Sequence, residues 1–144
     1  TLTIAGDGPL AQDLKILAAS LGIAESVTFA GHQSQEELAK LYAASNTFIL
    51  ASTNEVWGLV VNEALASGLH VIVSDKCGVA EFVRDMDGAF ICKTDQQSLQ
   101  EEMQASSRQW NGYIEEPEIL KFTPEKFADS VIDAVLKSTG SKSK

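Results

Sequence analysis

The most informative part of this chain is Glu55-Val-Trp-Gly-Leu-Val-Val-Asn-Glu63, continued by Ala64-Leu-Ala-Ser-Gly68 and Val71-Ile-Val73. It predicts a turn that carries a carboxylate, a helix whose first residue is Gly58, a second carboxylate within that helix, and then a buried strand. Apolar residues cover more than one face of the helix, so we expect it to be mostly buried. These residues are Leu59, Val60, Val61, Ala64 and Leu65.

The start of this helix has the properties of an anion site. Gly58 has no side chain, so a ligand can lie directly on the backbone N–H groups that open the helix. Those groups have no intrahelical acceptors and lie at the positive end of the helix dipole, which suits a phosphate. Glu55 and Glu63 flank the site, and ionised carboxylates accept hydrogen bonds from sugar hydroxyls, the ribose being one candidate. The alternative is a capped helix whose two carboxylates are solvated.

Length and composition favour one globular domain. The chain has 144 residues, of which 44% are hydrophobic and 22% charged. The net charge of −9 disfavours nucleic acid as a partner. The sequence contains neither a membrane-spanning apolar run nor a signal-peptide pattern, so we expect a cytoplasmic protein. Cys77 and Cys92 form no CxxC pair, and we interpret them as reduced thiols in or near the core.

Strands and helices are expected to alternate. Apolar runs predict strands at residues 2–6, 27–31, 47–51, 71–73 and 88–92. Helices are predicted at 9–21, with Pro9 as the first residue, at 34–43, 58–68, 77–83 and 95–103, and from Pro124 to Leu136. Ser34 and Glu37 predict a capping box for the second of these helices, and Asp95 is expected to cap the fifth. The apolar face of the last helix is expected to contain Phe127, Val131, Ile132, Val135 and Leu136. Residues 110–120 suggest a loop with a helical turn. We therefore expect one domain over residues 1–137 and a disordered polar tail over 138–144.

Continuous apolar strands between helices are typical of a doubly wound α/β fold with a parallel sheet covered on both faces. Ligands of such sheets bind beyond the carboxyl ends of the strands. Four glycine-bearing loops are expected at that edge: Gly6-Asp-Gly8, Gly31-His32, Ser52 to Gly58, and Asp75 to Gly78. A nucleotide-sized site at this edge is therefore plausible.

One motif points to a different cofactor. Gly6-Asp-Gly8-Pro-Leu-Ala11 matches the GxGxxA fingerprint of dinucleotide-binding proteins. That fingerprint also needs an acidic residue at the end of the next strand, to bind the ribose. The next strand ends in Ala30-Gly31-His32 and has no acidic residue there. The absence of this residue disfavours a nicotinamide-dependent oxidoreductase, which stays an alternative.

Several single residues have two interpretations. His32 can stack on a base or be an ordinary loop histidine, and Trp57 can pack against a ligand or in the core beneath the loop. His70 is expected at the exposed start of a strand, and Trp110 has no informative context. The spacing of His, Cys, Asp and Glu matches no metal site.

The segment from Glu55 to Gly68 resembles the E-x7-E signature of the retaining glycosyltransferases of family 4, which have the GT-B fold. The likeness covers about residues 1–105. Further segments occur in the family's order: Ile4 to Pro9, Val27 to Gly31, Leu38 to Tyr42, Phe48 to Ser52, Val71 to Asp75, Gly78 with Glu81, and Asp87-Gly88. The chain departs from the family's usual residues at Ser45-Asn46, Leu69-His70, Cys77 and Ala80.

The resemblance implies a role for each matched residue. Glu55 would be the catalytic residue and would contact the donor sugar near its reacting carbon. The amides around Gly58, Leu59 and Val60 would bind the diphosphate, and Glu63 would bind the ribose hydroxyls.

Gly31 and His32 would line the base pocket, and we place Gly6, Gly8 and Trp57 at the same donor site. Similar enzymes need neither a metal nor a cofactor, and their substrate is a nucleotide-diphosphate sugar.

The resemblance also implies the activity of the whole protein. It would be a hexosyltransferase-like enzyme that transfers sugar to a glycan or lipid-linked acceptor, as in cell-envelope polysaccharide synthesis. The family's basic strand-loop and its acceptor-binding N-terminal domain do not precede Thr1. We therefore expect this chain alone to be inactive, with the N-terminal domain as its partner and as the part in contact with the inner face of the membrane.

We also expect that the central strand is missing between residues 2–5 and 47–50, or that these strands have closed the gap. A non-catalytic nucleotide-sugar-binding module is the second alternative.

Overall fold

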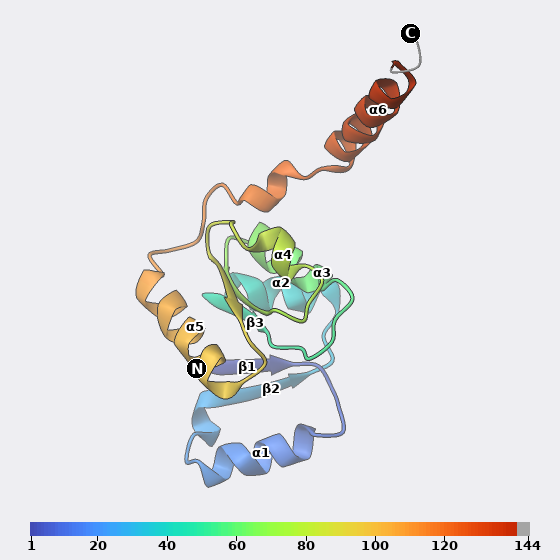
Figure 1. Cartoon of the computed structure of the whole chain (residues 1–144). Coiled ribbons are helices and arrows are strands. Elements are labelled where there is room, and N and C mark those ends of the chain that lie inside the picture. The colour runs from blue at the N-terminus through green and yellow to red at the C-terminus, as the bar shows by residue number, and fades with distance from the viewer. Residues whose placement is uncertain (141–144) are drawn as a thin grey trace. The chain divides into compact units, whose positions relative to one another are not determined.

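Parallel strands alternate with helices in the computed structural model, which describes residues 1–140 (Figure 1). Within the last helix, the side chains at positions 127, 130, 135, 136 and 138–140 are outside the description, as are residues 141–144. The chain divides into two compact units, Thr1–Ala43 and Ala44–Lys144. The predicted α/β class is confirmed.

The first unit contains a two-stranded parallel sheet. β1 (Leu2–Ala5) pairs with β2 (Val27–Gly31), and the register joins Leu2 to Val27. The helices of this unit are α1 (Ala11–Ser20), the 3₁₀ turn η1 (Ala24–Ser26) and α2 (Gln35–Ala43).

The start of each helix in this unit tests a sequence prediction. Ser34 and Glu37 form the expected capping box at α2, since Ser34 N donates to Glu37 Oε2 at 2.8 Å and Glu37 N donates to Ser34 Oγ at 3.3 Å. The predicted start of α1 at Pro9 is wrong, because Ala11 N bonds to Gly8 O in a turn and the helix begins at Ala11.

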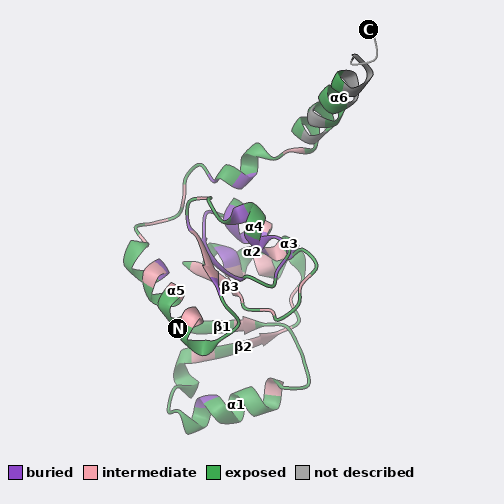
Figure 2. Cartoon of the chain, viewed as in Figure 1, coloured by how far each residue is buried: buried purple, intermediate pink, exposed green. Residues whose placement is uncertain are grey.

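The expected covering of both sheet faces is not found in the first unit. Most of β1 is exposed, and so are the leucines along α1, namely Leu10, Leu14, Leu17 and Leu21 (Figure 2). Only Ala18 of α1 is buried. A two-stranded sheet offers too little apolar surface to cover such a helix.

The second unit holds the core. β3 (Thr47–Leu50), β4 (His70–Ser74) and β5 (Ala89–Cys92) form a parallel sheet with β4 in the centre. All residues of β4 are buried. Since successive side chains of a strand point to opposite faces, both faces of β4 are covered. Within residues 1–140, no strand pairs with both sheets.

Helices α3 (Leu59–Ala66) and α5 (Gln96–Gln109) contact β4. The short helix α4 (Ala80–Val83) follows β4, and the 3₁₀ turn η2 (Glu118–Lys121) supplies the helical turn predicted within residues 110–120. Asp95 caps α5 as expected, since its Oδ1 accepts from Ser98 N at 2.8 Å.

The last helix is longer than expected. α6 (Pro124–Gly140) extends three residues into the predicted polar tail, whose residues 141–144 lie outside the description. Val131 and Ile132 of its apolar face are exposed, and the other expected members, Phe127, Val135 and Leu136, are among the side chains not described.

The prediction that His70 lies at an exposed strand end is wrong. His70 is 6% exposed, and its Nδ1 lies 3.0 Å from Ser106 Oγ on α5. Thr47 Oγ1 lies 2.9 Å from the same Ser106 oxygen. Trp110 packs edge-on against the His70 ring, with centroids 5.0 Å apart. The packing of α5 on the sheet therefore buries the start of β4, which the local sequence alone predicted to be exposed.

Candidate functional site

The loop that carries Glu55 is held by backbone hydrogen bonds to the segment after β4. Glu55 N donates to Lys76 O at 3.4 Å, Gly78 N donates to Glu55 O at 3.0 Å, and Val79 N donates to Trp57 O at 2.9 Å. The loops Ser52 to Gly58 and Asp75 to Gly78, both predicted at the carboxyl edge of the sheet, are thus side by side.

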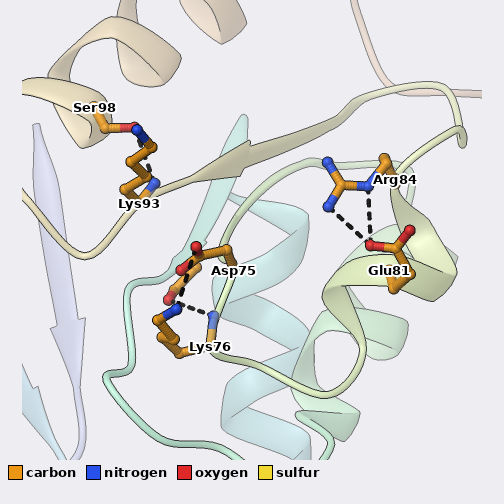
Figure 3. A network of polar contacts seen from close by, with 7 residues as sticks. Asp75, Lys76, Glu81, Arg84, Lys93 and Ser98 are labelled. Carbon is orange, nitrogen blue, oxygen red and sulfur yellow. Dashed lines mark hydrogen bonds and ion pairs between the residues drawn. The ribbon is translucent and has the colours of Figure 1, made fainter.

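The partner segment is itself fixed by local contacts. Lys76 N donates to Ser74 Oγ at 3.0 Å, and the Lys76 ammonium lies 3.5 Å from the Asp75 carboxylate (Figure 3). On α4, Arg84 donates twice to Glu81 Oε2, at 2.9 and 3.1 Å (Figure 3). These exposed ion pairs contribute little to the stability of the fold. The hydrogen bond from Lys76 N to Ser74 Oγ fixes the turn in which the Lys76 carbonyl accepts from Glu55 N.

Gly58 precedes α3 rather than forming its first residue. It has the left-handed φ of +97°, which glycine adopts without strain. Gly58 is buried, and a Cβ there would lie 3.0 Å from Leu50 Cδ2 and 3.5 Å from Val79 Cγ1. The left-handed φ favours glycine at this position, and the burial of Gly58 beneath the loop differs from the expectation that a ligand lies directly on it.

The open part of this helix start lies at Leu59 and Val60. Leu59 is 66% exposed and Val60 is half-buried. Their amides belong to the first turn, where N–H groups have no intrahelical acceptor. Glu63 is exposed one helical turn after Leu59, on the same face. The expectation of a mostly buried helix is correct for Val61, Ala64 and Leu65 alone.

Glu55 is half-buried where the two loops meet. Its Oε1 accepts a hydrogen bond from Trp57 N at 3.4 Å. Burial raises the pKa of the neighbouring Cys77 thiol, and the negative charge of Glu55 raises this pKa further. Cys77 and Cys92 are both free and buried, as the sequence predicted.

Trp57 does not lie in the core beneath its loop, and its packing against a ligand stays a prediction. Its ring packs against Phe82 of α4, with centroids 5.8 Å apart, and 39% of the side chain stays exposed. The exposed part lies in the same loop as Glu55.

The predicted site residues of the first unit meet at the carboxyl ends of β1 and β2. Gly6 N donates to Gly31 O at 2.7 Å, and His32 N donates to Asp7 Oδ2 at 2.9 Å. Gly31 has a φ of +70°, and a Cβ there would lie 3.4 Å from Asp7 Oδ1. His32 and Gly8 are exposed. Asp7, which the sequence analysis did not single out, thus orients the turn that carries His32.

Two further observations concern the rest of the surface. A hollow of about 370 Å³ lies along α5 and is lined by Gln100, Met103, Gln104, Ser107 and Arg108, none of which is a candidate residue. Among residues 1–140, no helix has the length and apolar character to cross a membrane.

The sequence matches the family model described as "Glycosyl transferases group 1" over residues 1–116. Alpha-monoglucosyldiacylglycerol synthase of Streptococcus pneumoniae (strain ATCC BAA-255 / R6) is 49% identical over 71 residues, which are 49% of this chain.

Two solved structures are similar in fold. WaaG, a glycosyltransferase involved in lipopolysaccharide biosynthesis, matches with a TM-score of 0.65 at 24% identity over 74% of this chain. Sucrose-phosphate synthase from Thermosynechococcus elongatus matches with a TM-score of 0.65 at 28% identity, also over 74% of this chain. The match spans 16% of the pneumococcal synthase and 29% of each of the two solved chains.

Proposed function

The chain belongs to the family of glycosyl transferases group 1, and we propose that it forms the donor-binding part of a retaining glycosyltransferase. In this proposal the whole protein moves a sugar from a nucleotide-diphosphate sugar to a glycan or lipid-linked acceptor. The observation that carries the proposal is the start of α3. Leu59 is exposed and Val60 is half-buried there, their N–H groups belong to the first helical turn, and Glu55 and Glu63 lie before and after them in sequence.

The chemistry of transfer explains why such a helix start is useful. Breaking the bond between the sugar and the diphosphate places negative charge on the leaving diphosphate. Preformed N–H donors stabilise charge where it develops, and the helix dipole adds to this effect. We assign the diphosphate to the amides of Leu59 and Val60, with Gly58 shaping the turn that exposes them.

The two carboxylates are assigned to different hydroxyl groups. Glu55 would contact the sugar near the reacting carbon, because its loop turns directly into the diphosphate-binding helix start. Glu63, one turn into α3, would accept hydrogen bonds from the ribose. Neither role requires a metal ion or a cofactor.

We assign recognition of the base to the first unit. The turn Gly31-His32, which Asp7 orients, carries an exposed imidazole that can stack on or hydrogen-bond a base. In the neighbouring loop, Gly6 and Gly8 have no side chains, and Asp7 lies between them. We infer that Gly31 and His32 line the base pocket.

The acceptor and the cellular location are inferred from relatives. The pneumococcal synthase and WaaG are named for a glycolipid and for lipopolysaccharide biosynthesis. We propose a lipid-linked or glycan acceptor of the cell envelope, reached at the inner face of the membrane. Because the match spans only 29% of the solved chains, we expect transfer to need the remainder of the full-length protein.

The test uses the full-length protein with Glu55→Ala. For a transferase, this variant should still bind uridine diphosphate but should lose sugar turnover. A non-catalytic binding module would bind the nucleotide and show no turnover even without the substitution.

Titration with reduced nicotinamide cofactor separates the remaining alternative. A transferase binds uridine diphosphate in preference, whereas preferential binding of the nicotinamide cofactor would overturn the proposal.

A further inference from the structure

Three aromatic rings form a row that starts at the Glu55 loop. The centroids of Trp57 and Phe82 are 5.8 Å apart with their planes tilted by 40°. The centroids of Phe82 and Phe122 are 4.9 Å apart, with the planes at 71°, an edge-on contact. These separations fall in the range of favourable aromatic pairs. We call these residues the ring row.

The ring row joins three segments that are distant in sequence. Trp57 lies in the loop before α3, Phe82 lies on α4, and Phe122 directly follows η2. Thr123, the next residue, accepts a hydrogen bond from Lys126 N at its Oγ1 and so caps the start of α6. The row therefore connects the loop that carries Glu55 to the beginning of α6.

Phe82 and Phe122 each lie on a firmly anchored turn. Ala80 and Val83, on either side of Phe82, are 3% and 0% exposed. Ile119, whose carbonyl accepts from Phe122 N at 3.1 Å, is 8% exposed. The buried residues fix the backbone positions of Phe82 and Phe122, so that their rings can hold the Trp57 indole in place.

The rings themselves are not part of the core. Trp57, Phe82 and Phe122 are 39%, 36% and 60% exposed. Removing a ring at such a position opens no closed cavity, and its cost in stability is correspondingly small. The row thus suits the positioning of a loop better than the stabilisation of the fold.

We propose that Phe82 and Phe122 are positioning residues of the donor site: they hold the Trp57 indole and, through the loop backbone, the Glu55 carboxylate in the geometry needed for sugar transfer. This inference depends on the proposed function. The link between the two residues is the Trp57 N–H, which donates to Glu55 Oε1 at 3.4 Å, so a displacement of Trp57 also disturbs the Glu55 carboxylate.

The experiment compares Phe122→Ala with Leu120→Ala in the full-length protein. Leu120 is a matched control, because it lies in η2, is 57% exposed, and is an apolar residue of the same segment. Phe122→Leu keeps an apolar side chain but removes the ring, and Phe122→Tyr keeps the ring.

Two readouts are taken from these variants. The first is the ¹⁹F resonance of 5-fluorotryptophan at position 57, identified by its loss in Trp57→Phe. The second is steady-state kinetics of sugar transfer, with kcat and the donor KM determined separately.

Phe122→Ala and Phe122→Leu should shift the Trp57 resonance and lower kcat about tenfold, since small misplacements of a reacting group have such effects. The donor KM should change less than kcat, because the amides that bind the diphosphate are untouched. Phe122→Tyr should restore kcat, and Leu120→Ala should match the unmodified protein.

An unshifted Trp57 resonance, or a kcat equal to that of Leu120→Ala, would overturn the positioning role. If the unmodified protein neither binds a nucleotide diphosphate nor transfers sugar, the proposed function itself fails and the positioning role fails with it. The Trp57 resonance distinguishes that outcome from failure of the ring row alone.

Discussion

Gly78 lies so close to Val56 that a β-carbon at position 78 would be 2.0 Å from the Val56 carbonyl oxygen. The same β-carbon would lie 3.4 Å from the Trp57 Cα. Because the obstacle is backbone, no change of rotamer can relieve it. The contact explains how the loop that carries Glu55 packs against the segment after β4, and it makes that packing open to test.

Gly78→Ala should therefore displace the Glu55 loop. Overpacking of this kind costs about 1–3 kcal/mol of unfolding free energy, and sugar turnover should fall with it. Gly8→Ala is the control for stability, because a Cβ there meets nothing within 4 Å. Equal unfolding free energies for the two variants in urea titrations would contradict this account of the loop.

Glu63→Ala in the full-length protein should weaken donor binding. The loss of hydrogen bonds to the ribose is expected to cost about 1–3 kcal/mol of binding free energy. Calorimetric titration with a nucleotide diphosphate measures it. Glu116→Ala removes another exposed carboxylate of the second unit and should bind as the unmodified protein does. If Glu63→Ala bound the nucleotide diphosphate as tightly as the unmodified protein does, Glu63 would have no role in binding the ribose.

Protonation of His70 should destabilise the second unit. Burial lowers the pKa of His70 below its usual value, although Ser106 and the charge of Asp87 partly oppose this effect. An unfolded histidine titrates near pH 6.5. Stability from the neutral ring is therefore complete above about pH 6.5 and is lost as the pH falls toward the lower pKa of the folded state. Urea unfolding at pH 8 to 5 should show this loss, and His70→Asn should show less of it. The same pH dependence in both proteins would refute the role of His70.

Glu55→Gln should lower the pKa of Cys77. The Glu55 carboxylate is, after burial, the main cause that raises this pKa, so its neutralisation should favour the thiolate. The pH dependence of iodoacetamide labelling, followed on the Cys77 peptide by mass spectrometry, measures the change. Cys92 is an internal control, because its raised pKa has burial as the largest cause and owes nothing to Glu55. A Cys77 profile that does not move would show that Glu55 does not face this thiol.

The regular elements could be predicted because their signals are local. Continuous apolar runs indicate the strands, and helical spacing indicates most of the helices. The caps at Ser34 and Asp95 occur as predicted. The start of α1 was misplaced because Pro9 fits both a first helical residue and the turn that precedes one.

The site was only partly predictable because its contacts join distant residues. The burial of His70 depends on Ser106 and Trp110, which α5 brings to the strand end. The packing of Gly58 against Leu50 and Val79, likewise, has no signal within the motif itself. Sequence reasoning placed the loops Ser52 to Gly58 and Asp75 to Gly78 at the same edge of the sheet, and the structure has them side by side. The tertiary structure decides which of their residues are exposed.

The central claim is that a diphosphate binds to the first-turn amides of Leu59 and Val60 at the start of α3. The most direct measurement is a titration of the full-length protein, labelled with ¹⁵N at leucine and valine, with uridine diphosphate. We predict that the amide resonances of Leu59 and Val60 shift more than those of the buried strand residues Val71 and Val73. Binding that leaves the Leu59 and Val60 resonances unchanged, or the absence of binding, would contradict the claim.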